Sequence, residues 1–144
     1  MNNQKAVAKV KVAFEDELTE DDIVYILSTG LSGSCGFSSV RNPKKEYAKA
    51  KEELKSKLGP NDELCYEDVQ ARILSNGGAI ELQDPDDGHW GKLTLKNLVQ
   101  GLEKYFKEGW SGGFKTMHDL VENSDFDDCD CILQAAVWGD VIYG

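Results

Sequence analysis

No stretch of this sequence approaches the roughly 18 consecutive apolar residues of a membrane-spanning helix, which excludes a span and contact with a bilayer interior. Residues 1–5 are polar apart from the initial methionine and lack the apolar core of a signal peptide. We therefore expect a soluble, cytoplasmic protein. A chain of 144 residues with ordinary apolar content is expected to build a single hydrophobic core.

Basic residues are scarce. The chain has 16 Lys and Arg against 26 Asp and Glu, which gives a net charge of −10, and Arg41 and Arg72 are the two arginines. Residues 117–144 contain no Lys or Arg at all. Because nucleic-acid binding depends on neutralising phosphates with cations, this balance argues against direct nucleic-acid binding.

The motifs of several enzyme classes are missing. The chain has no Gly-x-Ser-x-Gly elbow, no phosphate-binding Gly-Lys-Ser/Thr loop and no His-Glu-x-x-His zinc motif. His89 and His118 are its two histidines, and neither lies in a recognisable catalytic pattern. The acidic stretches 84–88 and 125–130 lack the spacing of a calcium loop, and we interpret them as a turn and a helix cap. We therefore expect no catalysis and no cofactor.

The four cysteines form no Cys-x-x-Cys pair, and a cytosolic chain keeps its thiols reduced. Cys129 and Cys131 are two residues apart, so on a helix their side chains point about 200° apart. That geometry is unfavourable for one zinc ion, which needs four ligands. We expect packed thiols rather than a metal site.

Hydrophobic periodicity predicts one α+β domain, residues 1–144, with a small, mainly antiparallel sheet packed by about five helices. Strands are expected at 6–14, 79–83 and 89–93. The first helix follows Thr19, which begins a capping box, and a small-residue loop over residues 30–37 ends it. Further helices are expected at 44–58, at 62–75 with Tyr66 on its apolar side, from Thr94 to a stop at Gly109, and from about Asp127, where Gly139 continues the apolar stripe. Residues 110–124 are predicted to be a loop.

The helix at 44–58 is rich in Lys and Glu, and its apolar positions, Tyr47, Leu54 and Leu58, are sparse. Residues 44–64 therefore look like an inserted helix and loop that protrude from the surface.

Several segments resemble a family of small uncharacterised acidic proteins of bacterial phages and prophages. The resemblance lies in Trp90-Gly91-Lys92-Leu93-Thr94-Leu95 and its continuation to Phe106, in residues 22–31, in Asn76-Gly77-Gly78, and in the closing stretch 130–144. The chain departs from that family at residues 32–37, where the family has a Gly-Gly-x-x-Tyr-Trp loop, and at the inserted residues 44–64. The resemblance implies a bacterial host but brings no catalytic residues.

Two groups of residues are candidates for binding. The first is an acidic patch in the segment that has no compensating cation, and it comprises Asp125, Asp127, Asp128 and Asp130. The second comprises residues of two glycine-rich loops that allow close approach or present a ring, namely Ser34, Phe37, Trp110 and Phe114.

Our leading hypothesis is a phage or prophage accessory protein without catalytic activity. It would bind a host protein through its acidic surface and so inhibit a defence component. One alternative is a sponge that captures a small nucleotide signal, although phosphate recognition favours arginine and the chain has two. A second is a metal-assisted hydrolase that uses Asp86, Asp87, His89 and the acids of 127–130. A third is a structural protein that forms homo-oligomers.

We predict that the protein folds without metal, because no four ligands share a recognisable spacing. Treatment with a chelator should change the melting temperature, followed by circular dichroism, by less than about 5 °C. A larger decrease would contradict this prediction.

Overall fold

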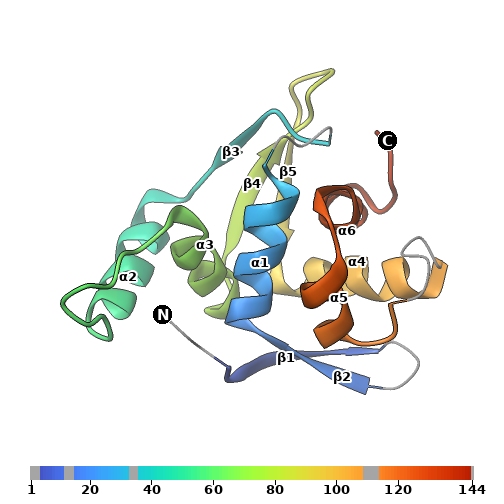
Figure 1. Ribbon diagram of the computed structural model, residues 1–144. Helices are drawn as coiled ribbons and strands as arrows, with labels where there is room; N and C mark the ends of the chain where they lie inside the picture. The colour runs from blue at the N-terminus through green and yellow to red at the C-terminus, as the bar shows by residue number, and fades with distance from the viewer. Residues whose placement is uncertain (1–3, 12–14, 33–35, 109–113, 144) are drawn as a thin grey trace.

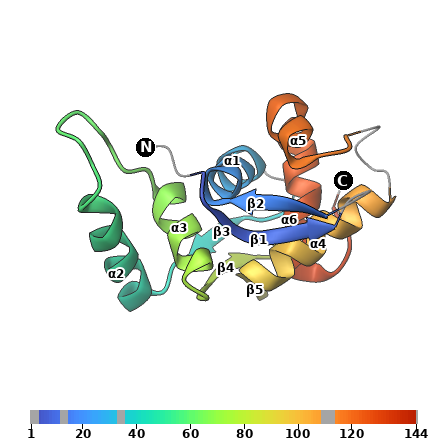
Figure 2. The same ribbon diagram turned by 90° about the horizontal axis from the view of Figure 1, so that it is seen from below.

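The computed structural model describes residues 4–11, 15–32, 36–108 and 114–143. Over these ranges the chain forms six helices, a two-stranded antiparallel sheet and a three-stranded antiparallel sheet (Figure 1). The predicted α+β class is therefore confirmed. The two sheets are separate, and helices occupy the space between and around them (Figures 1 and 2).

Strands β1 (Ala6–Lys11) and β2 (Glu15–Thr19) form an antiparallel hairpin across the lower end of the molecule in Figure 1. Val10 and Leu18 are fully buried, whereas Lys9 is exposed, as alternation along a strand requires. The predicted first strand is thus confirmed over residues 6–11, and residues 12–14 lie outside the described ranges. Strand β2 was not predicted, because Leu18 is its one apolar residue and acids dominate the rest.

Helix α1 (Glu20–Gly30) begins as its sequence predicts. The Thr19 hydroxyl accepts from the Asp22 amide at 3.2 Å, and the Asp22 carboxylate accepts from the Thr19 amide at 2.9 Å. This reciprocal pair satisfies two amides at the start of the helix. The helix then buries Ile23, Ile26 and Leu27, which are each 0% exposed.

Strands β3 (Ser39–Arg41), β4 (Ala79–Gln83) and β5 (Trp90–Thr94) form the second sheet in the order β3-β4-β5. In the predicted β4–β5 hairpin, Ile80 lies opposite Leu93, and both are fully buried. On β3, Arg41 donates to Glu81 at 3.0 and 3.1 Å and lies 4.2 Å from the centre of the Trp90 ring.

Helices α2 (Lys44–Lys55) and α3 (Tyr66–Ser75) pack against each other, with α2 at the far end of the molecule in both views (Figures 1 and 2). Ala50 and Leu54 of α2 are fully buried. This burial gives α2 a larger part in the core than its sparse apolar pattern predicts. The expected burial of Tyr66 is wrong: this first residue of α3 is 72% exposed, and the buried part of the helix begins at Val69.

Helix α4 (Leu95–Glu108) is capped by Thr94, whose hydroxyl accepts from the Asn97 amide at 3.2 Å. Its buried stripe contains Leu98, Leu102 and Tyr105, as predicted. The expected stop at Gly109 lies outside the described residues.

Helix α5 (Met117–Asn123) corrects the predicted loop at 110–124. Met117 and Leu120 are buried at helical spacing, and Thr116 caps the helix by accepting from the Asp119 amide at 3.1 Å. The helix was missed because its seven residues make fewer than two turns, which is too short for an apolar stripe to be recognised in the sequence.

Helix α6 (Phe126–Trp138) contacts α1, α4 and β5. It ends at Gly139, which is exposed and caps the helix with a left-handed φ of 82°. The prediction that Gly139 continues the buried stripe is therefore wrong. The fully buried Gln134 holds the chain that follows: its Oε1 accepts from the amides of Ile142 and Tyr143 at 2.9 and 2.8 Å.

Helices α4 and α6 approach each other most closely at Gly101. A Cβ atom built on Gly101 would lie 2.8 Å from both the Ala136 nitrogen and the Ile132 oxygen. These atoms belong to the backbone of α6, so a rotamer change cannot relieve the contact.

We predict that Gly101→Ala lowers the free energy of unfolding by about 1–3 kcal/mol through overpacking. In an exposed helix the same change normally gains about 1 kcal/mol. Urea denaturation of the variant measures the sign directly. Gln100→Ala, at an exposed position of the same helix, should change stability by less than about 0.5 kcal/mol. A Gly101→Ala protein as stable as the parent would show that α4 and α6 separate at little cost.

Candidate functional site

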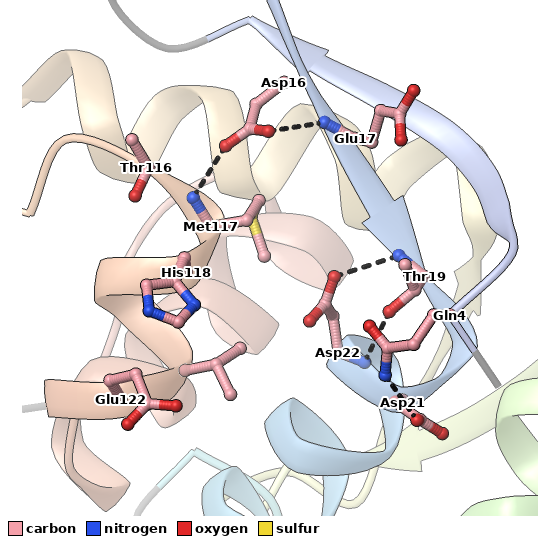
Figure 3. A pocket seen from close by; sticks show the side chains of 11 residues that line it. Gln4, Asp16, Glu17, Thr19, Asp21, Asp22, Thr116, Met117, His118 and Glu122 are labelled. Carbon is pink, nitrogen blue, oxygen red and sulfur yellow. Dashed lines mark hydrogen bonds between the residues drawn. The ribbon is translucent and has the colours of Figure 1, made fainter. Parts of the chain in front are cut away.

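A groove of about 600 Å³ opens between β2, the first turn of α1, and α5 (Figure 3). The side chains of β2 and α1 form one wall, and His118 and Glu122 of α5 lie on the opposite wall (Figure 3). The described residues that line it are Gln4, Asp16, Glu17, Thr19, Asp21, Asp22, Thr116, Met117, His118, Val121 and Glu122.

The groove is strongly acidic. Of its described lining residues five carry carboxylates, and none is Lys or Arg. The five are Asp16, Glu17, Asp21, Asp22 and Glu122. Carboxylates of one sign that face a shared cavity create a negative potential, which attracts cationic groups.

Two of these acids are engaged in the fold around the groove. One oxygen of Asp16 accepts from the Glu17 amide at 2.8 Å, and the other accepts from the Met117 amide at 2.9 Å (Figure 3). Asp16 therefore ties β2 to the first residue of α5. Asp22 closes the capping box of α1 with Thr19, within the wall that β2 and α1 form.

Burial raises the pKa of Asp22 above its ordinary value. The hydrogen bonds from Thr19 oppose this shift, and the neighbouring charges of Asp21 and Asp16 add to it. A cation bound in the groove would offset the electrostatic cost of these crowded, partly buried carboxylates, so the site favours a positively charged ligand.

The side chains of Glu17 and Glu122 differ from these structural acids. Both residues are exposed, and within the described part of the chain their carboxylates have no hydrogen-bond or ion-pair partner. Asp21 lies between the two kinds, because it accepts from the Gln4 side chain at 2.7 Å. The groove thus offers charges that are not needed to hold the fold.

The predicted acidic patch is largely committed to the start of α6. Asp125 is the N-cap and accepts from the Asp128 amide at 3.0 Å, which is the main reason that its pKa is lowered. Asp128 accepts from the Asp125 amide at 3.0 Å and from the hydroxyl of the buried Tyr105 at 2.7 Å. Asp127 is exposed, but Asp130 is only 5% exposed and accepts from Gln134 at 3.0 Å. Asp130 is therefore buried and not part of an exposed acidic patch.

Half of the second predicted group can be placed. Phe37 and Phe114 are described, whereas Ser34 and Trp110 lie outside the described residues. Phe37 is only 6% exposed and its ring lies 6.0 Å from that of Trp138, so it is packed in the core and not presented at the surface. Phe114 is half-buried and packs against the core.

The residues of the hydrolase alternative are also separated. His89 lies beside Trp138, with 6.3 Å between ring centres, at the last residue of α6. Asp127 lies at the opposite end of that helix, which at 1.5 Å per residue is roughly 17 Å away. In the turn, the Asp87 carboxylate accepts from the His89 amide at 2.8 Å, as the turn interpretation predicts. The two clusters therefore do not form one catalytic centre.

The described cysteines form no metal site. Cys65 is exposed, Cys131 is half-buried, and burial raises the pKa of the Cys129 thiol to about 12. Within the described ranges, no three His, Cys, Asp or Glu side chains are grouped so that they would hold a metal ion. In the same ranges no helix is both long and apolar enough to cross a bilayer.

In comparisons with known proteins, no family model, no curated protein and no solved structure matches the chain. The groove was missed at the sequence level because its walls come from residues 16–22 and 116–122, which lie about a hundred positions apart. The one signal was the acidic run that follows Thr19, which sequence reasoning assigned entirely to helix capping.

We predict that Asp128→Ala lowers the free energy of unfolding by about 1–3 kcal/mol, because it removes an acceptor from the buried Tyr105 hydroxyl and opens the capping box. Urea denaturation is the measurement. Asp127→Ala serves as the control and should cost less than about 1 kcal/mol, since that exposed acid interacts mainly with the helix dipole. Equal losses for the two variants would contradict the assigned role of Asp128.

Proposed function

We propose that the protein is a binding protein without catalysis that engages a basic segment of a partner protein through the acidic groove. The observation that carries this proposal is the set of five carboxylates around a cavity of about 600 Å³, with no lysine or arginine among its described lining residues. Lysine and arginine side chains of an extended segment are long enough to enter such a groove and pair with its walls.

The unpartnered carboxylates of Glu17 and Glu122 supply the free charge of this interaction. They lie on β2 and α5, on either side of the groove, and Asp16 fixes the spacing of those two elements. A rigid groove orders little on binding, so less of the electrostatic attraction is offset by lost conformational entropy.

The resemblance to acidic phage and prophage proteins supports a bacterial host protein as the partner. The role that we propose is that of an accessory protein that occupies a basic, nucleic-acid-binding surface of a host defence component. Its net charge of −10 would speed the approach to such a surface.

We predict that a synthetic peptide of alternating lysine and serine binds the protein, and that binding weakens steeply as salt rises from about 0.1 M to about 1 M, over which range the Debye length falls from about 10 Å to about 3 Å. The double variant Glu17→Gln/Glu122→Gln should bind about fivefold more weakly at the lower salt and show a shallower salt dependence. Fluorescence anisotropy of the labelled peptide measures both.

The matched control is Glu52→Gln/Glu63→Gln, which removes the same charge from two exposed positions that do not line the groove. It should bind the peptide nearly as the parent does. If both double variants weaken binding equally, the peptide responds to overall charge and the groove is not the site. If the groove variant alone loses peptide binding, capture from bacterial lysate with the parent and with the groove variant identifies the partner by the difference between the two.

A further inference from the structure

A second cavity, of about 250 Å³, lies beside the first residue of α1 and differs from the groove in charge. Glu20 lines this cavity, whereas Asp21 and Asp22, the next two residues, line the acidic groove. The described residues around the second cavity are Lys5, Val7, Glu20, Lys57, Arg72, Ser75 and Asn76.

Three cations converge on this cavity in a protein of net charge −10. They are Lys5, Lys57 and Arg72, which come from the start of the chain, the loop after α2, and α3. Glu20 is the one carboxylate among the described lining residues. Such a concentration of positive charge is unexpected from composition alone and suggests an anionic ligand.

Arg72 is held in place with donors left over. Its side chain is 11% exposed, and its Nε donates to Glu20 at 2.7 Å. The Ser75 hydroxyl donates to the same Glu20 oxygen at 2.6 Å, which fixes the carboxylate as well. Arg72 Nη1 lies 3.9 Å from Glu53, beyond hydrogen-bond distance, and no acceptor in the described structure receives a bond from Nη1 or Nη2.

Lys57 adds an exposed charge to the lining of the cavity. Its side chain is exposed and has no hydrogen bond or ion pair with the described residues. Glu53, whose carboxylate lies 3.9 Å from Arg72, accepts a hydrogen bond from the side-chain amide of Asn76 at 2.7 Å. Lys57 therefore brings to the cavity a positive charge that no described carboxylate pairs with.

We propose that this cavity binds the phosphate group of a small phosphate ester. A fixed guanidinium with free N–H donors, together with the unpaired ammonium group of Lys57 from another segment, is a donor set that recognises phosphate oxygens. The volume exceeds that of a phosphate group and admits part of the attached organic group. Val7 is the one apolar side chain in the described lining, so recognition depends on the phosphate rather than on stacking of a base.

The test is isothermal titration at constant ionic strength with inorganic phosphate, adenosine monophosphate and adenosine as three separate probes. Saturable binding is expected for the two phosphates, and none for adenosine. Lys57→Gln should weaken binding of adenosine monophosphate about fivefold, and Lys57→Arg should restore most of it. Neither substitution removes a contact within the described fold, so both proteins should keep the parent's melting temperature.

Lys55→Gln is the matched control, because it removes the same charge from an exposed position two residues away that does not line the cavity. Its affinity should equal that of the parent. Equal weakening by Lys55→Gln and Lys57→Gln would overturn the proposal in favour of a general charge effect. So would the absence of saturable binding, binding of inorganic phosphate but not of adenosine monophosphate, or binding of adenosine as tight as that of its monophosphate.

Discussion

Helix α6 determines where the other elements lie, because segments from four parts of the chain approach it at positions where they have no side chain. A Cβ atom at any of these glycines would lie within 3.0 Å of an α6 atom. The pairs are Gly30 with Leu133, Gly36 with Gln134, Gly91 with Val137, and Gly101 with Ile132. Since close packing in a core leaves few ways to shift a helix, these contacts fix α1, the chain before β3, β5 and α4 around one axis.

The position of α1 in turn places the two cavities. Its N-terminal end lies between the β1–β2 hairpin and the end of α3, and successive residues of a helix point about 100° apart. Glu20 therefore reaches Arg72 on one side, while Asp21 and Asp22 face the groove on another. A single capped helix start thus separates a negative surface from a positive one. The separation allows an acidic protein to retain a site for an anion.

The elements that could be predicted are those with a long, regular apolar pattern. Helices α1 and α4 have stripes of at least two turns, and the β4–β5 hairpin has a turn sequence between alternating strands, so local information was sufficient. Strand β2 has only Leu18 to bury, and pairing with β1 overrides its low strand propensity. Neither cavity could be predicted, because Asp16 meets Met117 and Glu20 meets Arg72 only through the tertiary fold.

The acidic residues of this protein fall into two kinds, and side-chain length helps to explain the division. Asp16, Asp22, Asp125 and Asp128 all accept from backbone amides, since a short carboxylate reaches the main chain of its neighbours. The predicted patch at 125–130 consists of such aspartates, and for that reason much of its charge is engaged within the fold. A glutamate has one more methylene group and extends beyond the helix or strand that bears it. In the acidic groove the free charge is carried by Glu17 and Glu122, although a denser run of aspartates lies at 125–130.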